Sequence, residues 1–111
     1  MDETPAPISL AAARALPWRL GQSAEAFRDG DIEVRFTGRP VTDRLHTHAR
    51  DELYIVASGS GTFRVGDQIS QVGAGDLLFA AAHTPHGFTR HSDDFAIWIV
   101  FYGPARDALF S

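Results

Sequence analysis

Short apolar runs separated by glycine fill most of this 111-residue chain. Apolar and polar residues alternate from Ile32 to Thr37, which is typical of a strand with one buried face. Residues 77–80 and 95–102 are continuous apolar runs, as expected of strands covered on both faces. Gly66 and Asp67 separate two further short runs and suit a tight hairpin. The pattern predicts an all-β sandwich or barrel of eight or so short strands.

The first thirty residues follow a different pattern. Two prolines favour a loose arm, and Ser9 is suited to cap a short helix over residues 10–16 that Pro17 ends. Trp18 and its neighbours are expected to pack against the barrel. The sequence therefore predicts one domain over residues 1–111, with an N-terminal arm and packing segment at 1–30, a barrel at 31–103 and a tail at 104–111.

Charge and composition narrow the classes of partner. The 10 basic residues against 14 acidic ones give a net charge of -4, which provides no general attraction to a phosphate backbone, so we expect no nucleic-acid partner. The chain has no apolar run long enough to cross a bilayer and no basic N-terminal start, so we expect a cytoplasmic protein without a membrane partner. There is no cysteine, so nitrogen and oxygen atoms must hold any metal.

Three potential metal ligands, His46, His48 and Glu52, fall within seven residues. Side chains at i and i+2 of a strand point to the same face, so a strand from Val41 to His48 would place both imidazoles on one wall. A bend at residues 49–51 would then let Glu52 begin the next strand. A helix is disfavoured because residues two apart on a helix do not share a face. The joint spacing favours a metal site over scattered surface histidines.

The order His-x-His-x3-Glu-x6-Gly, which ends at Gly59, resembles the first signature of the cupin family. The leading glycine of that signature lies six positions before the first histidine, whereas Gly38 lies eight positions before His46. The resemblance implies a double-stranded β-helix, also called a jelly roll, with the His-x-His strand facing one cavity.

Residues 75–86 resemble the second cupin signature and keep its glycine and its histidine, Gly75 and His86. Ala81 stands where proline is usual, His83 where glycine is usual, and Arg90 where the terminal asparagine would be. This signature implies that His86 is a further metal ligand.

The resemblance implies that one divalent transition metal binds to four residues: His46, His48, Glu52 and His86. Fe, Mn, Ni, Zn, Co and Cu all suit imidazole and carboxylate ligands, and the pattern does not choose among them. Four protein ligands leave open positions in a six-coordinate shell. A single carboxylate leaves the first shell near +1, which favours an anionic or chelating oxygen ligand.

Four other residues are candidates for catalytic or binding roles. Arg44 shares the strand parity of His46 and His48, and Arg90 that of His86, so either could hold a substrate carboxylate by a two-pronged hydrogen bond. Tyr54 shares parity with Glu52 and could line the pocket or offer a proton. His83 could act as a base or stand at the entrance. The competing interpretations are solvated surface residues for the arginines and His83, and core packing for Tyr54.

One alternative stays open in the last predicted strand. Either Ala96, Trp98, Val100 and Tyr102 face the interior, or Phe95, Ile97, Ile99 and Phe101 do. In both cases the aromatic bulk indicates a narrow apolar pocket or a packed dimer face.

Two functional classes fit these residues. The first is a metal-dependent enzyme, either a dioxygenase-like oxygenase or a non-redox isomerase or lyase, acting on a small organic acid or aromatic. The alternative is a non-catalytic module that binds or senses a sugar or another small metabolite. The resemblance to cupins of this size further implies a homodimer.

Overall fold

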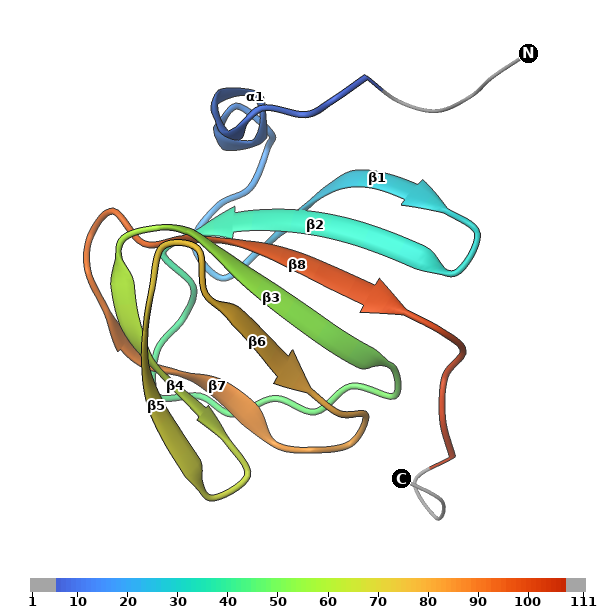
Figure 1. The fold of residues 1–111 in the computed structure, drawn as a ribbon, viewed down its shortest axis with the longest axis vertical. Coiled ribbons are helices and arrows are strands. Elements are labelled where there is room, and N and C mark those ends of the chain that lie inside the picture. Colours follow the sequence, from blue (N-terminus) through green and yellow to red (C-terminus); the bar gives the residue numbers. More distant parts are fainter. Residues whose placement is uncertain (1–5, 108–111) are drawn as a thin grey trace.

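The computed structural model describes residues 6–107, which fold mainly into antiparallel strands (Figure 1). Within that range, one five-stranded sheet has the order β1-β2-β8-β3-β6 and a three-stranded sheet has the order β5-β4-β7. The two antiparallel sheets and the single short helix confirm the all-β jelly-roll prediction. The elements are α1 (Leu10–Arg14), β1 (Ala24–Asp29), β2 (Ile32–Gly38), β3 (Asp51–Ser58), β4 (Ser60–Val65), β5 (Gln68–Gly73), β6 (Leu77–Ala80), β7 (His86–His91) and β8 (Ala96–Tyr102).

The core lies between the two sheets and combines aromatic with aliphatic side chains. Tyr54 on β3 packs edge-on against Phe63 of β4 and Phe88 of β7, with ring centroids 5.7 and 5.4 Å apart. Ile97 and Ile99 of β8 are buried in the same cluster. This settles the open question of the last strand: the set of Phe95, Ile97, Ile99 and Phe101 faces the interior.

The outer face of the five-stranded sheet carries a second apolar cluster under α1. The side-chain oxygen of Ser9 accepts a hydrogen bond from Ala12 N at 3.0 Å, which confirms the predicted helix cap. Trp18 packs over Gly38, where an added Cβ would lie 2.7 Å from the indole ring. Trp98 also packs against this cluster, so one face of β8 contacts the core between the sheets and the other contacts the cluster under α1.

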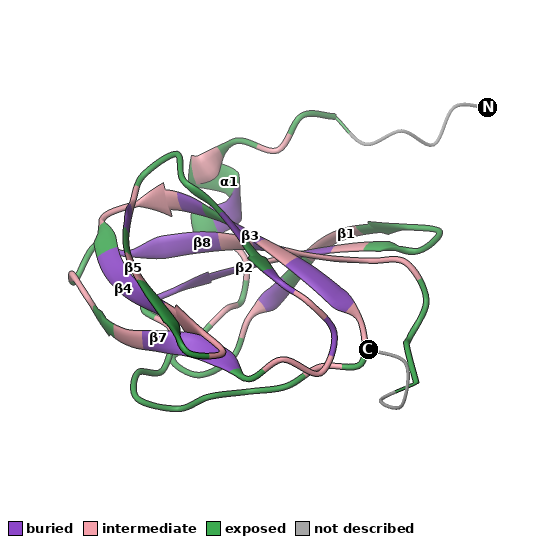
Figure 2. Cartoon of the chain, turned by 60° about the horizontal axis from the view of Figure 1, so that its bottom comes forward, coloured by how far each residue is buried: buried purple, intermediate pink, exposed green. Residues whose placement is uncertain are grey.

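The predicted strand over residues 41–48 is wrong. The segment makes only two isolated bridges to β7, a parallel one at Thr42 and an antiparallel one at His46. The change from parallel to antiparallel means that the chain turns between them, and Asp43 there has a left-handed φ of 57°. Continuous pairing along the segment is therefore impossible, and most of it is exposed (Figure 2).

Strand β1 was not predicted. It pairs with β2 through a hairpin at Gly30, whose φ is 56°, so strand pairing begins inside the segment expected to be an arm. Its sequence, Ala-Glu-Ala-Phe-Arg-Asp, has no β-branched residue and no regular apolar alternation. Of the helices in residues 6–107, none is long and apolar enough to cross a membrane.

Candidate metal site

Three predicted ligands come together at one end of the barrel. One ligand atom each from His48, Glu52 and His86 lies within 4.8 Å of the others. His86 Nε2 is 2.8 Å and His48 Nε2 is 3.7 Å from Glu52 Oε1. Glu52 is the second residue of β3 and His86 is the first residue of β7, whereas His48 precedes β3 by three positions. The site therefore joins two sheets and the irregular segment between β2 and β3.

The chemistry of this group fits a divalent metal. The side chains of Glu52 and His86 are only 2% and 1% exposed. Although Oε1 and Nε2 are 2.8 Å apart, their alignment does not make a hydrogen bond, and neither atom has another hydrogen-bond partner within residues 6–107. An unsatisfied buried polar atom costs about 1–3 kcal/mol, so this arrangement requires compensation. Ligand atoms bound at about 2.1 Å from one ion lie about 3–4 Å apart, and the separations of 2.8 and 3.7 Å are close to this range.

A backbone carbonyl orients the imidazole of His86. Its Nδ1 lies 2.8 Å from Thr84 O. Since a carbonyl can only accept, Nδ1 carries the hydrogen and donates it. The neutral ring then has its lone pair on Nε2, the atom that faces Glu52. The chain thus presets the tautomer that a metal ligand needs.

Protonation preferences differ between the two histidines of the group. Burial is the largest influence on the pKa of His86 and lowers it, but the Glu52 carboxylate and the Thr84 carbonyl outweigh burial and raise that pKa above its ordinary value. Burial lowers the pKa of His48. The charge of Glu52 raises this pKa, and His86 and His46 lower it further, so the pKa lies below its ordinary value. Burial also raises the pKa of the Tyr54 phenol, as does the nearby Glu52 carboxylate, so this hydroxyl stays protonated.

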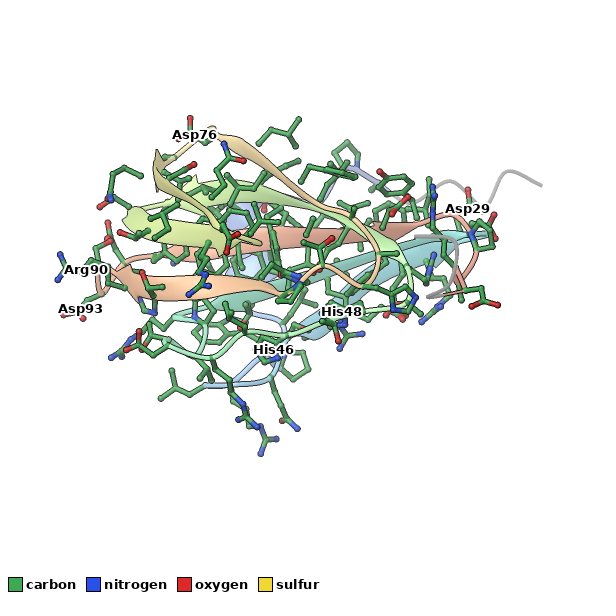
Figure 3. The ribbon with its side chains drawn as sticks, turned by 90° about the horizontal axis from the view of Figure 1, so that it is seen from below. Asp29, His46, His48, Asp76, Arg90 and Asp93 are labelled. Carbon is green, nitrogen blue, oxygen red and sulfur yellow. The ribbon has the colours of Figure 1, made fainter. Side chains whose placement is uncertain are left out.

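His46, the fourth predicted ligand, lies beside this group. Its backbone exchanges hydrogen bonds of 2.8 and 2.9 Å with that of His86. Its ring is nearly parallel to the ring of His48, with centroids 6.4 Å apart, and both labelled side chains lie close together in Figure 3. The His46 ring nitrogens are not within the 4.8 Å group, but the residue lines the same cavity. The structure thus brings three of the predicted ligands together and places the fourth next to them.

A cavity of about 420 Å³ opens over the site. Two of the remaining candidates, Tyr54 and Arg44, line this cavity. Arg90 does not: it is exposed, lines two other surface depressions and lies far from His48 in Figure 3. His83 does not line it either. The apolar part of its wall includes Phe88, Ile97, Ile99 and Phe101.

The C-terminal segment supports the site through contacts that the sequence did not reveal. Arg106 pairs with the buried Asp51 at 2.8 Å, and its backbone N donates to Ala49 O at 2.7 Å. His83 donates from Nε2 to Arg106 O and from its backbone N to His48 O, both at 2.7 Å. These contacts connect His83 and the tail to His48 and to Ala49 and Asp51, which follow it. The sequence showed only an acidic residue directly before Glu52, and neither its burial nor its partner could be read from it.

Two antiparallel sheets that enclose a His/Glu/His group define a small barrel with a candidate metal centre. The sequence pattern of the family described as "Cupin domain" matches residues 32–102, and the chain belongs to this family. The chain is 36% identical over 64 residues to an uncharacterized protein of Streptomyces coelicolor, covering 58% of this chain and 61% of that protein. It is 42% identical over 64 residues to acireductone dioxygenase 1 of Pectobacterium atrosepticum, covering 53% of this chain and 37% of that enzyme.

A solved structure shares the fold over most of the chain. A cupin-2 domain-containing protein from Shewanella frigidimarina superimposes with a TM-score of 0.71 over 86% of this chain and 94% of that chain, at 19% sequence identity. That likeness concerns the fold alone. The chain spans only 61% of the Streptomyces coelicolor protein and 37% of the Pectobacterium atrosepticum enzyme, so their whole-protein activities do not transfer directly.

Proposed function

We propose that this cupin is a metal-dependent enzyme that acts on a small organic acid or aromatic bound in the 420 Å³ cavity. One observation carries the proposal: Glu52 Oε1 and His86 Nε2 are buried 2.8 Å apart beside His48, and neither atom makes a hydrogen bond with the residues that the structure describes. His46 is the proposed fourth ligand. The metal is one of Fe, Mn, Ni, Zn, Co or Cu, because the ligands are imidazole and carboxylate.

Each residue around the site has a proposed task. A bound divalent ion supplies Lewis acidity toward a substrate oxygen and, if it is redox-active, the capacity for oxygenase chemistry. Glu52 provides the negative charge of the ligand set, and Thr84 fixes the ring of His86. The protonated Tyr54 hydroxyl can donate a hydrogen bond to a substrate oxygen. The apolar wall of the cavity excludes water from the reacting part of the substrate.

Oxygenase chemistry has specific support. The matched relative from Pectobacterium atrosepticum is named acireductone dioxygenase 1, and the similarity reaches 42% over 64 residues. We therefore place an oxygenase before a non-redox isomerase or lyase. The substrate of that relative is not assigned to this chain.

The test begins with metal analysis of protein purified without chelator. Fe(II)-loaded protein is expected to consume dioxygen with a member of a panel of diketones, phenolic acids and small keto acids, whereas the Zn(II) form is not, because zinc has no redox chemistry. Turnover by Mn(II), Ni(II) or Zn(II) protein without dioxygen would instead identify an isomerase or lyase. A ligand that raises the melting temperature while no metal form turns it over would indicate a binding or sensing module.

A second copy of the chain is the proposed partner of the outer face of β6. Leu77 and Phe79 on this edge strand are 64% and 49% exposed, and Leu77 pairs with the exposed Ile55 of β3. An exposed apolar edge strand is a site where strands of two copies can pair. Light scattering should report a dimer that Leu77→Glu converts to a monomer. Ile69→Glu, on the other sheet, is the matched control, and a wild-type monomer would refute the proposal.

A further inference from the structure

Two arginines line the cavity, and the guanidinium of one of them is fully engaged. Arg35 donates from Nε to Ser23 Oγ at 2.7 Å and from Nη2 to Ser23 O at 2.8 Å. Its Nη1 pairs with Glu33 Oε2 at 3.0 Å. All three nitrogens of Arg35 therefore have protein partners, and this side chain has little capacity left for a ligand.

Arg44 is different. It lines the same cavity, yet its guanidinium makes no hydrogen bond or ion pair with residues 6–107. A free guanidinium offers a planar pair of donors that matches the two oxygens of a carboxylate. The cavity thus has one cation available to a ligand within the described part of the chain.

The backbone of Arg44 is held against β7. Asp43 N donates to Phe88 O at 3.0 Å, and the His46 backbone pairs with that of His86. Between these contacts, the carbonyl oxygen of Arg44 lies against Gly87, where an added Cβ would be only 2.5 Å from it. This close approach fixes the start of the Arg44 side chain relative to the strand that begins with His86. These contacts preorganise the backbone of Arg44, whereas its free side chain still has to be ordered when a ligand binds.

The charge of the cavity favours an anion. Two carboxylates line it, Glu33 and Glu52, and two guanidiniums, Arg35 and Arg44, balance them. A divalent ion at the His48/Glu52/His86 group would leave its positive charge uncompensated. The apolar wall of Phe88, Ile97, Ile99 and Phe101 would contact the rest of the ligand.

We propose that Arg44 binds the carboxylate of the substrate, and that the substrate is a carboxylic acid with an apolar or aromatic body and a second oxygen function directed to the metal group. The inference rests on the proposed function, since it takes the cavity to be the substrate site. Arg44 is then the residue that selects acids over their neutral analogues.

The test compares acids with their methyl esters on Zn(II)-loaded protein whose metal content has been measured. The probes are phenylpyruvate, benzoylformate and 4-methyl-2-oxovalerate, each titrated by calorimetry beside its ester. Wild-type protein should prefer at least one acid, and Arg44→Gln should weaken its binding about 10- to 100-fold, as expected when hydrogen bonds to a charged group are lost. Arg44→Gln should leave ester affinity and metal content unchanged.

Arg39→Gln is the matched control, because Arg39 is an exposed arginine of the same segment that lies outside this cavity. It should leave acid binding unchanged. The inference would be overturned if the wild type bound acids and esters equally or bound none of the three acids. It would also be overturned if Arg44→Gln left acid binding unchanged. If the wild type holds no stoichiometric metal, the proposed function fails instead. The same titrations on metal-free protein would then still decide the role of Arg44.

Discussion

The candidate ligands are held in two different ways. Glu52 and His86 belong to regular strands, and their side chains are almost completely buried. His46 and His48 belong to the irregular segment before β3, where the side chain of His48 is 39% exposed. The strand ligands thus sit in a preformed core, whereas the segment ligands depend on a few backbone contacts.

Metal affinity therefore depends on two things: the sheet pairing that holds the strand ligands and the few backbone contacts that hold the segment ligands. The strand ligands have their donor atoms fixed by sheet pairing and by the hydrogen bond from His86 to Thr84. The position of His48 relies on the hydrogen bond from His83 N and on the contact of Arg106 with Ala49. Loss of a strand ligand should therefore remove the site, whereas changes in or near the segment should weaken it.

The largest effect is expected from Glu52→Gln. The amide keeps the shape of the side chain but removes the charged ligand, so affinity for Zn(II) should fall by more than about 100-fold, beyond the 10–100-fold typical of changes outside the first shell. His46→Gln should cost about tenfold, because the His46 ring nitrogens lie outside the 4.8 Å group. Competition with a chromophoric chelator measures both.

Thermal unfolding of the metal-free variants provides the control, since Glu52→Gln and His46→Gln should both remain folded. An equal loss of affinity in the two variants would contradict the contrast between strand and segment ligands. It would show that the segment reorganises around the ion and contributes His46 fully.

A smaller effect is expected from Arg106→Ala. This change removes the ion pair with Asp51 and loosens the tail beside His48, so metal affinity should fall about tenfold. The free energy of unfolding should change by no more than about 1 kcal/mol, because the Arg106 side chain is largely exposed. Isothermal titration with Zn(II) and chemical denaturation of the metal-free protein separate the two effects.

Arg14→Ala is a matched control, since Arg14 also spans a long sequence separation, to Ser58, but lies in α1. It should leave metal affinity unchanged. Equal losses in both variants would mean that Arg106 acts through general stability rather than by positioning the segment.

Local patterns predicted most of the regular elements for a physical reason, although they missed β1 and wrongly predicted that both faces of β6 are covered, since Leu77 and Phe79 are exposed. Alternation over residues 32–37 reflects the one buried face of β2, and Gly66 with Asp67 provides the turn between β4 and β5. These properties depend on neighbouring residues in the chain. Where the pattern was ambiguous, as in β8 with apolar residues on both faces, only the packing of α1 and the second sheet could identify the inner face.

The errors occur where distant residues determine the structure. The segment at 41–48 has apolar and polar residues that fit a strand, but its bridges to β7 and the φ of Asp43 prevent regular pairing. The ion pair between Asp51 and Arg106 joins residues 55 positions apart, which no local pattern encodes. For the site, spacing grouped His46, His48 and Glu52, of which only His48 and Glu52 belong to the 4.8 Å group, whereas the resemblance was needed to add His86.

The last and smallest expected effect is a difference in protonation between the two regions. In the metal-free protein, the pKa of His86 should lie above the ordinary value of about 6.5, and that of His48 below it. Proton-detected NMR of ¹⁵N-labelled histidine across pH 5–8 would measure both. Opposite shifts would confirm the difference between a buried strand ligand beside a carboxylate and a half-exposed segment ligand. Shifts in the same direction would contradict it.

The two histidines should also affect stability with opposite signs. The raised pKa of His86 means that its stabilising contribution is complete below about 6.5 and is lost as pH rises through its folded-state pKa. The lowered pKa of His48 gives a contribution that is present above about 6.5 and is lost as pH falls through its folded-state pKa. Glu52→Gln removes the carboxylate that raises the pKa of His86 while burial remains, so this pKa should drop. As pH rises from 5 to 8, the metal-free variant should therefore gain stability relative to the metal-free wild type. The reason is that the wild type loses the stabilising contribution of protonated His86 over this range, whereas the variant does not.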